Sequence, residues 1–244
     1  MAFRDKGSKI IIKTPEQIDG IRKSSVLAGQ TLQVVKEYIK PGVTTEFLNK
    51  ICADFIRDNK ATAATLGYNG YPKETCISVN DVVCHGIPGP YELRESDIVN
   101  VDVTTILNGY YGDTSKMFAV GQITEHAQKL IDVAKECLRI GIKQCYSGNR
   151  VGNIGYEINK YATSFGYSVV YEFCGHGVGL RFHEEPEICH VDEKNNGPQL
   201  APGMIFTIEP MINAGKPEPK LIRKIKGQLE QLMENYLLNL SILF

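Results

Sequence analysis

One hairpin signal, Asn108-Gly109, constrains this chain more than any other feature. Both residues tolerate the positive φ that a two-residue type I′ turn requires. The flanking runs in the stretch DIVNVDVTTILNGYYGDTSK (97–116) are rich in Val, Ile, Thr and Tyr, which is typical of strands. A two-residue loop here would set three facing pairs across the hairpin: Leu107 with Tyr110, Thr104 with Asp113, and Asp102 with Ser115.

This register makes Asp102 and Asp113 diagonal neighbours on one face, with Cβ atoms roughly 7 Å apart. Asp102 lies in an otherwise apolar strand, where an unpaired carboxylate is costly. Two carboxylates this close need a cation between them or must share a proton. The alternative at this point is that one aspartate caps a turn and the other is solvated at a sheet edge, as most surface carboxylates are.

The composition is that of a soluble globular protein. At 244 residues with 43% hydrophobic side chains, the chain can form a single-domain core without a disulfide or metal staple. A net charge of −1 argues against nucleic acid or an anionic membrane as the partner. The start, MAFRDKGSKIII, does not resemble a signal peptide, and no apolar run is long enough to span a bilayer.

The cysteines predict a reducing environment. They lack any C-x-x-C pair and their number is odd, which argues against a disulfide framework and a structural zinc site. The seven residues are Cys52, Cys76, Cys84, Cys137, Cys145, Cys174 and Cys189. We therefore expect free thiols in a cytoplasmic protein.

Helix signals and strand signals alternate in two similar blocks. Thr14 is expected to cap a first helix running to about residue 39, with Pro15 at its first position and Gln17 completing a capping box. Thr44 or Thr45 begins a second helix, and two later helices are expected over 124–144 and 154–165. Strands are expected over 76–80, 82–84, 167–173 and 204–208, with a polar loop over 181–202. Two helices followed by strands, occurring twice, predict a pseudo-duplicated α+β domain.

Other residues that can do chemistry lie near predicted strand ends. His176 lies between two glycines, which let backbone approach closely and leave the imidazole uncovered. Glu209 ends an apolar strand and precedes Pro210, which cannot continue a ladder. A partly buried, hydrogen-bonded histidine and a turn-capping glutamate are the structural alternatives.

The remaining histidines divide into two kinds. His85 and His183 end apolar segments next to a tight turn or a Pro-bearing loop, whereas His126 and His190 lie in unremarkable polar settings. Strand-end carboxylates with one or two imidazoles would form an oxygen-rich pocket. Such a ligand set suits Mn, Fe or Co better than structural zinc.

Six motifs in order resemble type I methionine aminopeptidases of metallopeptidase family M24. They are VVCHGIP, VNVDV, GYYGDTSKMF, CGHGVG, FHEEP and PGMIFTIEPMINAG, and the similarity extends from about residue 13 to about residue 223. The short N-terminus is similar to the bacterial form. The resemblance implies a pita-bread fold, an α+β architecture of two pseudo-symmetric halves whose antiparallel sheet is covered by helices around a dinuclear metal site.

The resemblance also implies a role for each matching residue. Asp102 would chelate one metal, Asp113 would bridge both, and His176 and Glu209 would bind the other. His85 and His183 match the catalytic, substrate-contacting histidines of the family. Four further residues fall where the family lines its methionine pocket: Tyr68, Tyr71, Cys76 and Phe182.

The implied activity is removal of the initiator methionine from nascent proteins when the second residue is small, by metal-activated water. Two divalent ions (Co, Mn, Fe or Zn) would be the cofactors. The implied partners are nascent polypeptide N-termini, with the ribosome as one place to meet them. We expect a monomer.

The C-terminus departs from this family. A bridging glutamate in a Q-[FY]-E-H-T strand is absent, so we expect a catalytic domain over 1–223 and a non-family tail over 224–244. Glu230 and Glu234 are the available substitutes, although no motif aligns them. Residues 227–244 can be back-translated with freely chosen codons. When the same string of bases is translated from a start two bases later, it can read T-V-R-T-I-D-G-K-L-S-A-Q-F-E-H-T-I. This possibility predicts a frameshift near residues 224–227.

One alternative function and one expectation about stability follow from the altered tail. Without the fifth ligand, the chain could be a catalytically impaired or non-catalytic pita-bread protein that binds peptides. Loss of a C-terminal strand would leave an unpaired sheet edge and favour aggregation. A proline-specific peptidase of the same fold is a further alternative, and the missing N-terminal domain and the Tyr-rich pocket argue against it.

Overall fold

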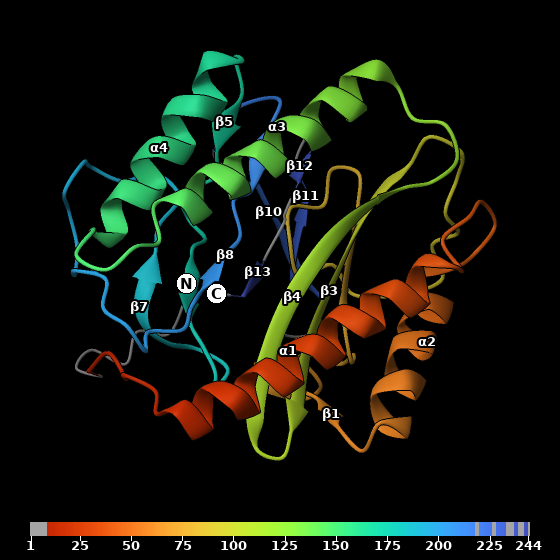
Figure 1. Ribbon diagram of the computed structural model, residues 1–244. Coiled ribbons are helices and arrows are strands. Elements are labelled where there is room, and N and C mark those ends of the chain that lie inside the picture. The colour runs from red at the N-terminus through yellow and green to blue at the C-terminus, as the bar shows by residue number, and fades with distance from the viewer. Residues whose placement is uncertain (1–8, 218–219, 226–227, 233–236, 239–241, 244) are drawn as a thin grey trace.

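The computed structural model describes residues 9–217 and four C-terminal backbone segments, 220–225, 228–232, 237–238 and 242–243. Its central feature is the long hairpin of β3 (Ile98–Leu107) and β4 (Tyr110–Ala119) (Figure 1). Asn108 and Gly109 form the loop with φ of 52° and 82°. The three facing pairs expected from the sequence are all present, so the predicted register is confirmed.

The first half of the chain places two helices against this hairpin. They are α1 (Pro15–Lys36) and α2 (Thr45–Asp58). The sheet has the order β1 (Thr62–Ala63), β3, β2 (Cys76–Val79), and β4 pairs with the same β3. A 3₁₀ turn, η1 (Tyr68–Gly70), lies between β1 and β2. The apolar side chains of β3 and both helices form one buried cluster that anchors the hairpin.

The second half repeats the pattern with shorter strands. Helices α3 (Glu125–Lys143) and α4 (Val151–Ser164) pack together over it. Its strands are β5 (Ser168–Val169), β6 (Gly175–Gly177), β7 (Glu184–Ile188), β8 (Thr207–Ile208) and β9 (Ile212–Asn213). Side chains of the two helices and of these strands form the larger buried cluster. The expected α+β architecture is confirmed.

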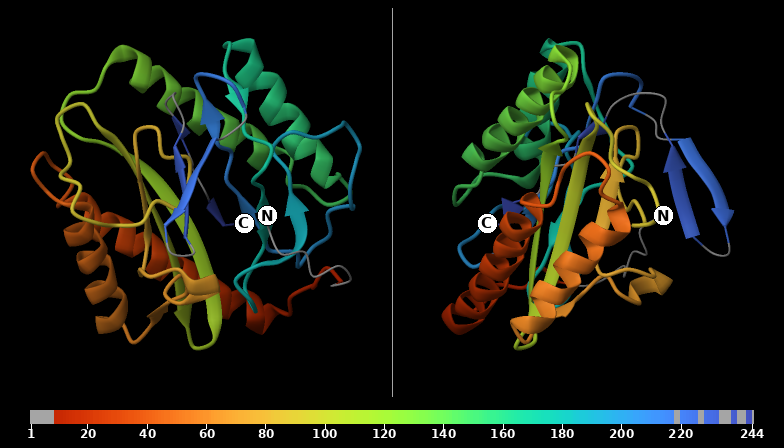
Figure 2. Two further views of the ribbon diagram at one scale, coloured as in Figure 1. Left: turned by 180° about the vertical axis from the view of Figure 1, so that it is seen from behind. Right: turned by 90° about the vertical axis from the view of Figure 1, so that its right-hand side faces the viewer.

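The C-terminal segment adds four strands. β10 (Lys220–Ile225) and β11 (Gln228–Leu232) pair with each other as a separate ribbon, which extends away from the body in the right-hand view of Figure 2. β12 (Leu237–Leu238) pairs with β9, and β13 (Ile242–Leu243) pairs with β8. The unpaired edge expected from the altered tail is therefore wrong for these two strands. Glu230 lies in β11, and Glu234 lies outside the described residues.

Helix starts follow the sequence signals closely. Thr14 caps α1 with a complete capping box, and Thr44 caps α2. Thr124 caps α3, whereas α4 begins three residues before the expected position.

Strand predictions were less accurate. No strand forms over 82–84, because Asn80 at φ 53° and His85 at φ 55° turn the chain on either side of it. The strands expected over 167–173 and 204–208 shorten to β5 and β8, and the expected loop over 181–202 contains β7.

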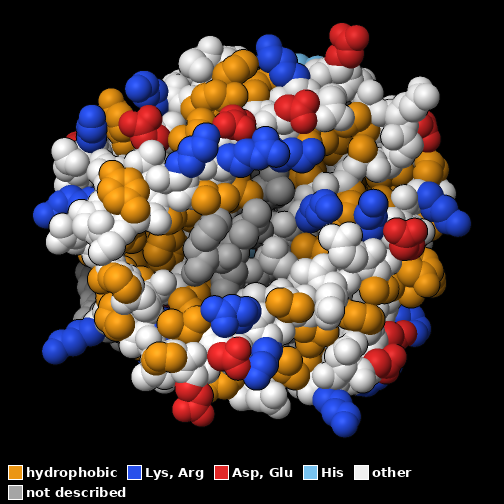
Figure 3. Space-filling view, in the orientation of Figure 1, with side chains coloured by type: hydrophobic (Ala, Val, Ile, Leu, Met, Phe, Trp, Pro, Cys, Tyr) orange, Lys and Arg blue, Asp and Glu red, His pale blue; other side chains and the backbone are white. Residues whose placement is uncertain are grey.

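The surface carries both signs of charge. On the face shown in Figure 3, Lys and Arg side chains are interspersed with Asp, Glu and hydrophobic ones, so neither sign dominates. Within the described parts of the chain, no helix has both the length and the apolar character needed to cross a membrane.

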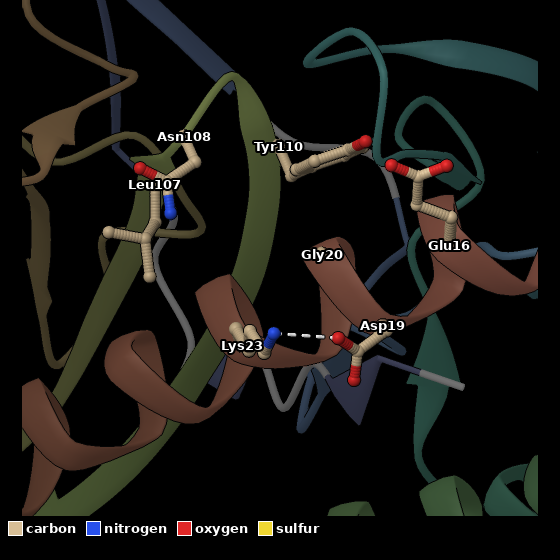
Figure 4. A pocket seen from close by; sticks show the side chains of 7 residues that line it. All are labelled: Glu16, Asp19, Gly20, Lys23, Leu107, Asn108 and Tyr110. Atoms are coloured by element: carbon tan, nitrogen blue, oxygen red, sulfur yellow. Dashed lines mark ion pairs between the residues drawn. The ribbon is translucent and has the colours of Figure 1, made fainter.

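The tip of the hairpin rests on the first turns of α1. The ring of Tyr110 covers Gly20, beside a small polar pocket that includes the Asp19–Lys23 ion pair (Figure 4). A Cβ on Gly20 would lie 2.4 Å from the Tyr110 ring. In the same helix, a Cβ on Gly29 would meet nothing within 4 Å. The two glycines thus separate close packing from helix propensity.

We expect Gly20→Ala to lower the free energy of unfolding by about 1–3 kcal/mol, because the ring must move to admit the methyl group. Gly29→Ala is the matched control and should raise it by about 0.5–1 kcal/mol through helix propensity. Urea denaturation measures both. Equal effects in the two variants would contradict the close contact at Gly20.

Candidate active site

The hairpin brings two carboxylates to one place. Asp113 is 5% exposed, and its Oδ1 accepts a hydrogen bond from the Thr104 hydroxyl at 2.9 Å. Asp102 Oδ1 is buried and has no hydrogen-bond partner among the residues that the structure describes. A buried carboxylate oxygen without a partner is costly, so its retention indicates a ligand. The structure supports the sequence interpretation of this pair and not the solvated edge.

Strands β6 and β8 bring a histidine and a third carboxylate to the same place. His176 Nε2 lies 3.5 Å from Asp113 Oδ2 and 3.6 Å from Glu209 Oε1. Thr207 holds both partners, since its hydroxyl accepts from the His176 backbone N–H at 2.9 Å and donates to Glu209 Oε1 at 2.6 Å. The four residues Asp102, Asp113, His176 and Glu209 thus converge.

The glycines beside His176 serve backbone packing. A Cβ on Gly175 would lie 2.3 Å from the carbonyl oxygen of Thr207, and one on Gly177 would lie 2.3 Å from that of Glu185. β6 can therefore lie against both neighbouring segments only with glycine at these positions. From the sequence, these glycines were expected to leave the imidazole open to a ligand. The structure shows that close strand packing requires them.

The contacts of His176 favour a positive charge beside it. Its Nδ1 lies 3.0 Å from the Gly177 carbonyl oxygen, to which it can only donate. Its Nε2 faces two carboxylate oxygens, so a positive charge between them, such as a bound cation, is favourable. A metal-binding histidine commonly donates its other N–H to a backbone carbonyl in this way.

These donors fit a divalent metal. Two donors at about 2.1 Å from one ion lie roughly 3–3.5 Å apart, close to the separations around His176 Nε2. Within the described residues, no three His, Cys, Asp or Glu side chains already lie close enough together to hold a metal ion. Charge repulsion keeps carboxylates apart when no cation lies between them, so a bound ion would draw these donors closer.

The carboxylates have raised pKa values. Burial raises the pKa of Asp102 well above its usual value, and the negative charges of Asp113 and Glu209 raise it further. Burial also raises the pKa of Asp113, although His176 and the Thr104 hydrogen bond oppose the shift. Burial raises the pKa of Glu209 to about 7. Such raised values are typical of groups that a bound cation would hold ionised.

An aromatic wall lies beside the carboxylates. The His183 ring lies 4.2 Å from that of His176 and 4.4 Å from that of Phe182. His183 Nδ1 is hydrogen-bonded to the Tyr68 hydroxyl at 2.8 Å, and Tyr111 stacks on Phe182 with centroids 6.2 Å apart. Desolvation, together with His176 and His85, lowers the pKa of His183 to about 3, although part of the residue remains exposed at the rim of the site.

Three further residues lie near this group: His85, Tyr71 and Cys76. His85 has a positive φ of 55°, which is uncommon for a residue other than glycine. Burial lowers its pKa, and so does His176. Cys76 pairs with Asp102 across β2 and β3, and the Tyr71 hydroxyl bonds to the Gly86 carbonyl oxygen at 2.9 Å. All the residues singled out from the sequence therefore lie around one site.

Comparisons with known proteins agree with this geometry. The family model "Metallopeptidase family M24" matches residues 19–231. Methionine aminopeptidase from Salmonella typhimurium (strain LT2) is 52% identical over 208 residues, which are 84% of this chain and 79% of that protein. The chain belongs to the methionine aminopeptidase group of metallopeptidase family M24.

Solved structures of the group share the whole fold. The crystal structure of methionine aminopeptidase from Rickettsia prowazekii aligns with a TM-score of 0.93 at 40% identity, covering 96% of this chain and 95% of that one. The methionine aminopeptidase of Thermotoga maritima aligns with a TM-score of 0.92 at 31% identity, covering 96% and 94%. The pita-bread fold expected from the resemblance is confirmed.

Several residues that support the site of this M24 chain were not among those predicted from the sequence. His190, expected in an unremarkable polar setting, is 1% exposed, and its Nε2 accepts from the Glu209 backbone N–H at 3.1 Å. Thr207 and Tyr111 were not predicted either. The Thr207 hydroxyl lies between His176 and Glu209, and no sequence pattern pointed to it. Its position two residues before Glu209 nevertheless places both side chains on one face of the extended segment.

A buried ion pair holds the loop that carries His183. Lys13 Nζ is paired with Glu184 Oε2, and their side chains are only 1% and 2% exposed. Glu184 Oε1 accepts from the backbone N–H groups of Leu180 and Arg181 at 2.7 and 2.8 Å. The Lys13 backbone N–H donates to Gly203 O at 2.8 Å. The segment before α1 is thereby tied to the site.

We expect Lys13→Met to lower the free energy of unfolding by about 3–5 kcal/mol, because it leaves the Glu184 charge buried without its partner. Lys13→Met combined with Glu184→Gln removes both charges and keeps an acceptor for the two N–H groups. The double variant should recover at least half of the loss in denaturant unfolding. A double variant no more stable than Lys13→Met would contradict this account.

Asp102 and Asp97 are two aspartates of the same sheet region whose replacement by Asn should affect stability in opposite directions. Asp97 is also buried, at 6% exposed, but it accepts from Asn80, Tyr91 and the Arg94 backbone N–H. Asp102→Asn should leave the metal-free protein at least as stable, because it relieves like-charge repulsion. Asp97→Asn should cost about 1–3 kcal/mol by breaking satisfied hydrogen bonds.

The two variants should differ in the opposite sense in metal affinity: Asp102→Asn should weaken metal binding, whereas Asp97→Asn should not. Calorimetric titration with Mn²⁺ should give at least about tenfold weaker binding for Asp102→Asn, since even outer partners of a metal site have effects of this size. Asp97→Asn should bind Mn²⁺ as the parent does. Equal Mn²⁺ affinity in the Asp102 variant and the parent would rule out Asp102 as a ligand.

Proposed function

We propose that this protein is a metal-dependent aminopeptidase that removes the N-terminal methionine from nascent proteins whose second residue is small. The observation that carries the proposal is that His176 Nε2 lies 3.5 Å from Asp113 and 3.6 Å from Glu209, near Asp102, whose Oδ1 has no hydrogen-bond partner among the described residues. The 52% identity to a methionine aminopeptidase supports the substrate class.

Four residues would hold the metal: Asp102 on one ion, Asp113 between two ions, and His176 and Glu209 on the other. Divalent ions there would lower the pKa of a bound water to produce a nucleophile near neutral pH. We propose two ions, with Co, Mn, Fe or Zn as candidates. Thr104, Thr207 and the Gly177 carbonyl orient these ligands through the hydrogen bonds described above.

The histidines at the rim would act on the peptide. When the Tyr68 hydroxyl donates to His183 Nδ1, the Nε2 of His183 carries the proton and can donate to the carbonyl oxygen of the scissile bond. His85 lies near the same residues, where its ring can hold the peptide beyond the cut or move a proton. Both rings are held by neighbours, which lowers the cost of orienting them.

A mixed aromatic and sulfur-bearing wall would receive the methionine side chain. Tyr68 and Phe182 pack with centroids 4.7 Å apart, and Tyr71 and Cys76 lie near Asp102. An unbranched thioether fits an apolar pocket of this kind and makes favourable contacts with aromatic rings. We propose that these four residues select methionine.

The setting and the tail complete the proposal. A monomer in the cytoplasm would meet its substrates as nascent chains, including at the ribosome. We further propose that 1–223 is the catalytic domain and that 224–244 is a frameshifted tail. The positions where the shifted reading places its glutamate, residues 240 and 241, lie outside the described residues.

Release of methionine from Met-Ala-Ser tests the function. We expect release with Mn²⁺ or Co²⁺, loss of release with a chelator, and no release from Met-Lys-Ser, whose second residue is large. Because a bridging ligand is missing, the rate should be low. Tight metal uptake without any release would favour the non-catalytic, peptide-binding alternative.

Restoring the shifted reading tests the tail. The chain through Ile225, continued by TVRTIDGKLSAQFEHTI, should release methionine at least about tenfold faster than the chain as it stands, because the ligand set is completed. The matched control carries Gln in place of the glutamate in that Q-F-E-H-T segment. Equal rates for the restored chain and its Gln control would contradict a ligand role for the glutamate.

A further inference from the structure

Two cysteines face each other behind the metal site. β6 and β7 are antiparallel, and Gly175 pairs with Ile188. The next residues along, Cys174 and Cys189, are therefore opposite each other. Directly opposite residues in such a ladder have Cα atoms about 4.5–5.5 Å apart, with side chains on one face. A disulfide requires about 4.4–6.8 Å, so the two backbones lie within reach of one.

The two side chains also influence each other. Cys189 is the first cause of the raised pKa of Cys174, and burial adds to the shift. Both side chains are half-buried, whereas Cys76 and Cys84 near the carboxylates are buried. The pair therefore combines proximity with partial access to a small oxidant.

We propose that Cys174 and Cys189 form a reversible intramolecular disulfide, a redox modification site of the strand pair that carries His176. The oxidant is a low-molecular-weight disulfide such as glutathione disulfide. One of the two cysteines, after losing its proton to water, attacks one of the oxidant's sulfurs, which forms a mixed disulfide and releases one glutathione thiolate. That thiolate takes the proton of the other cysteine, whose sulfur then attacks the protein sulfur of the mixed disulfide and releases the second glutathione as a thiolate, which takes a proton from water. Two thiols lose two electrons and two protons, and one glutathione disulfide becomes two glutathiones.

The bond would also affect His176. To form the bond, the two sulfurs must close to about 2.05 Å, which draws β6 toward β7 two residues from the imidazole. His176 would then shift relative to Glu209, and displacements of about 1 Å have large effects at such sites. This second effect rests on the proposed metal-binding function, whereas the disulfide itself does not.

Peptide mapping by mass spectrometry tests the disulfide. The full-length, reduced protein is treated with glutathione disulfide, and remaining thiols are alkylated before digestion. We expect a peptide pair linked through Cys174 and Cys189 that lacks two hydrogen atoms and disappears with dithiothreitol. Cys145→Ser, which alters a half-buried cysteine elsewhere, should retain the link. Two unlinked thiols, two separate glutathione adducts, or links to other cysteines would overturn the proposal.

Titration with Mn²⁺ tests the coupling to His176. The oxidised protein should bind Mn²⁺ at least threefold more weakly than the reduced protein, and dithiothreitol should restore the affinity. Cys189→Ser should bind Mn²⁺ equally before and after oxidant treatment. Equal affinity of a fully linked and a reduced sample would overturn the coupling. Failure of the reduced protein to bind Mn²⁺ would count against the proposed function, and the linked peptide would still be decided by mass spectrometry.

Discussion

Repulsion among three closely placed, largely buried carboxylates is the constraint that the site depends on. Asp102, Asp113 and Glu209 lie near one imidazole, whose Nε2 faces two of them. The fold tolerates this arrangement because the Thr104 and Thr207 hydroxyls donate to Asp113 and Glu209, and because the His190 ring accepts from the Glu209 backbone N–H. A folded protein that keeps charges together at such a cost provides a site for cations, and stability is lost in exchange for function.

The two halves of the molecule contribute differently to that site. The first half offers a long, regular hairpin whose core face is anchored by α1 and α2. The second half offers short strand ends, held by close backbone contacts at Gly175 and Gly177. A rigid element thus carries Asp102 and Asp113, while His176 and Glu209 come from strands joined across the chain. Their meeting point lies between the two helix-backed cores.

The C-terminal strands illustrate the difference between forming a fold and forming a site. β12 and β13 pair with β9 and β8 through backbone groups, which almost any residue can supply. Coordination instead requires one particular side chain at one position. An altered sequence can therefore continue the sheet and still lack a ligand. The expectation of an unpaired edge was therefore wrong for β12 and β13. The absence of a fifth metal ligand stays a prediction.

The sequence by itself determined the features that depend on neighbouring residues. The Asn108-Gly109 loop, the register that aligns Asp102 with Asp113, and the capped start of α1 were predictable because turn and cap chemistry act locally. Its motif order also determined the family. Tertiary structure alone decided the rest: the short extents of β5 and β8, the burial of His190 behind Glu209, and the pairing of Lys13 with Glu184. These features depend on contacts between residues far apart in the chain, and no local pattern encodes which distant backbone will approach.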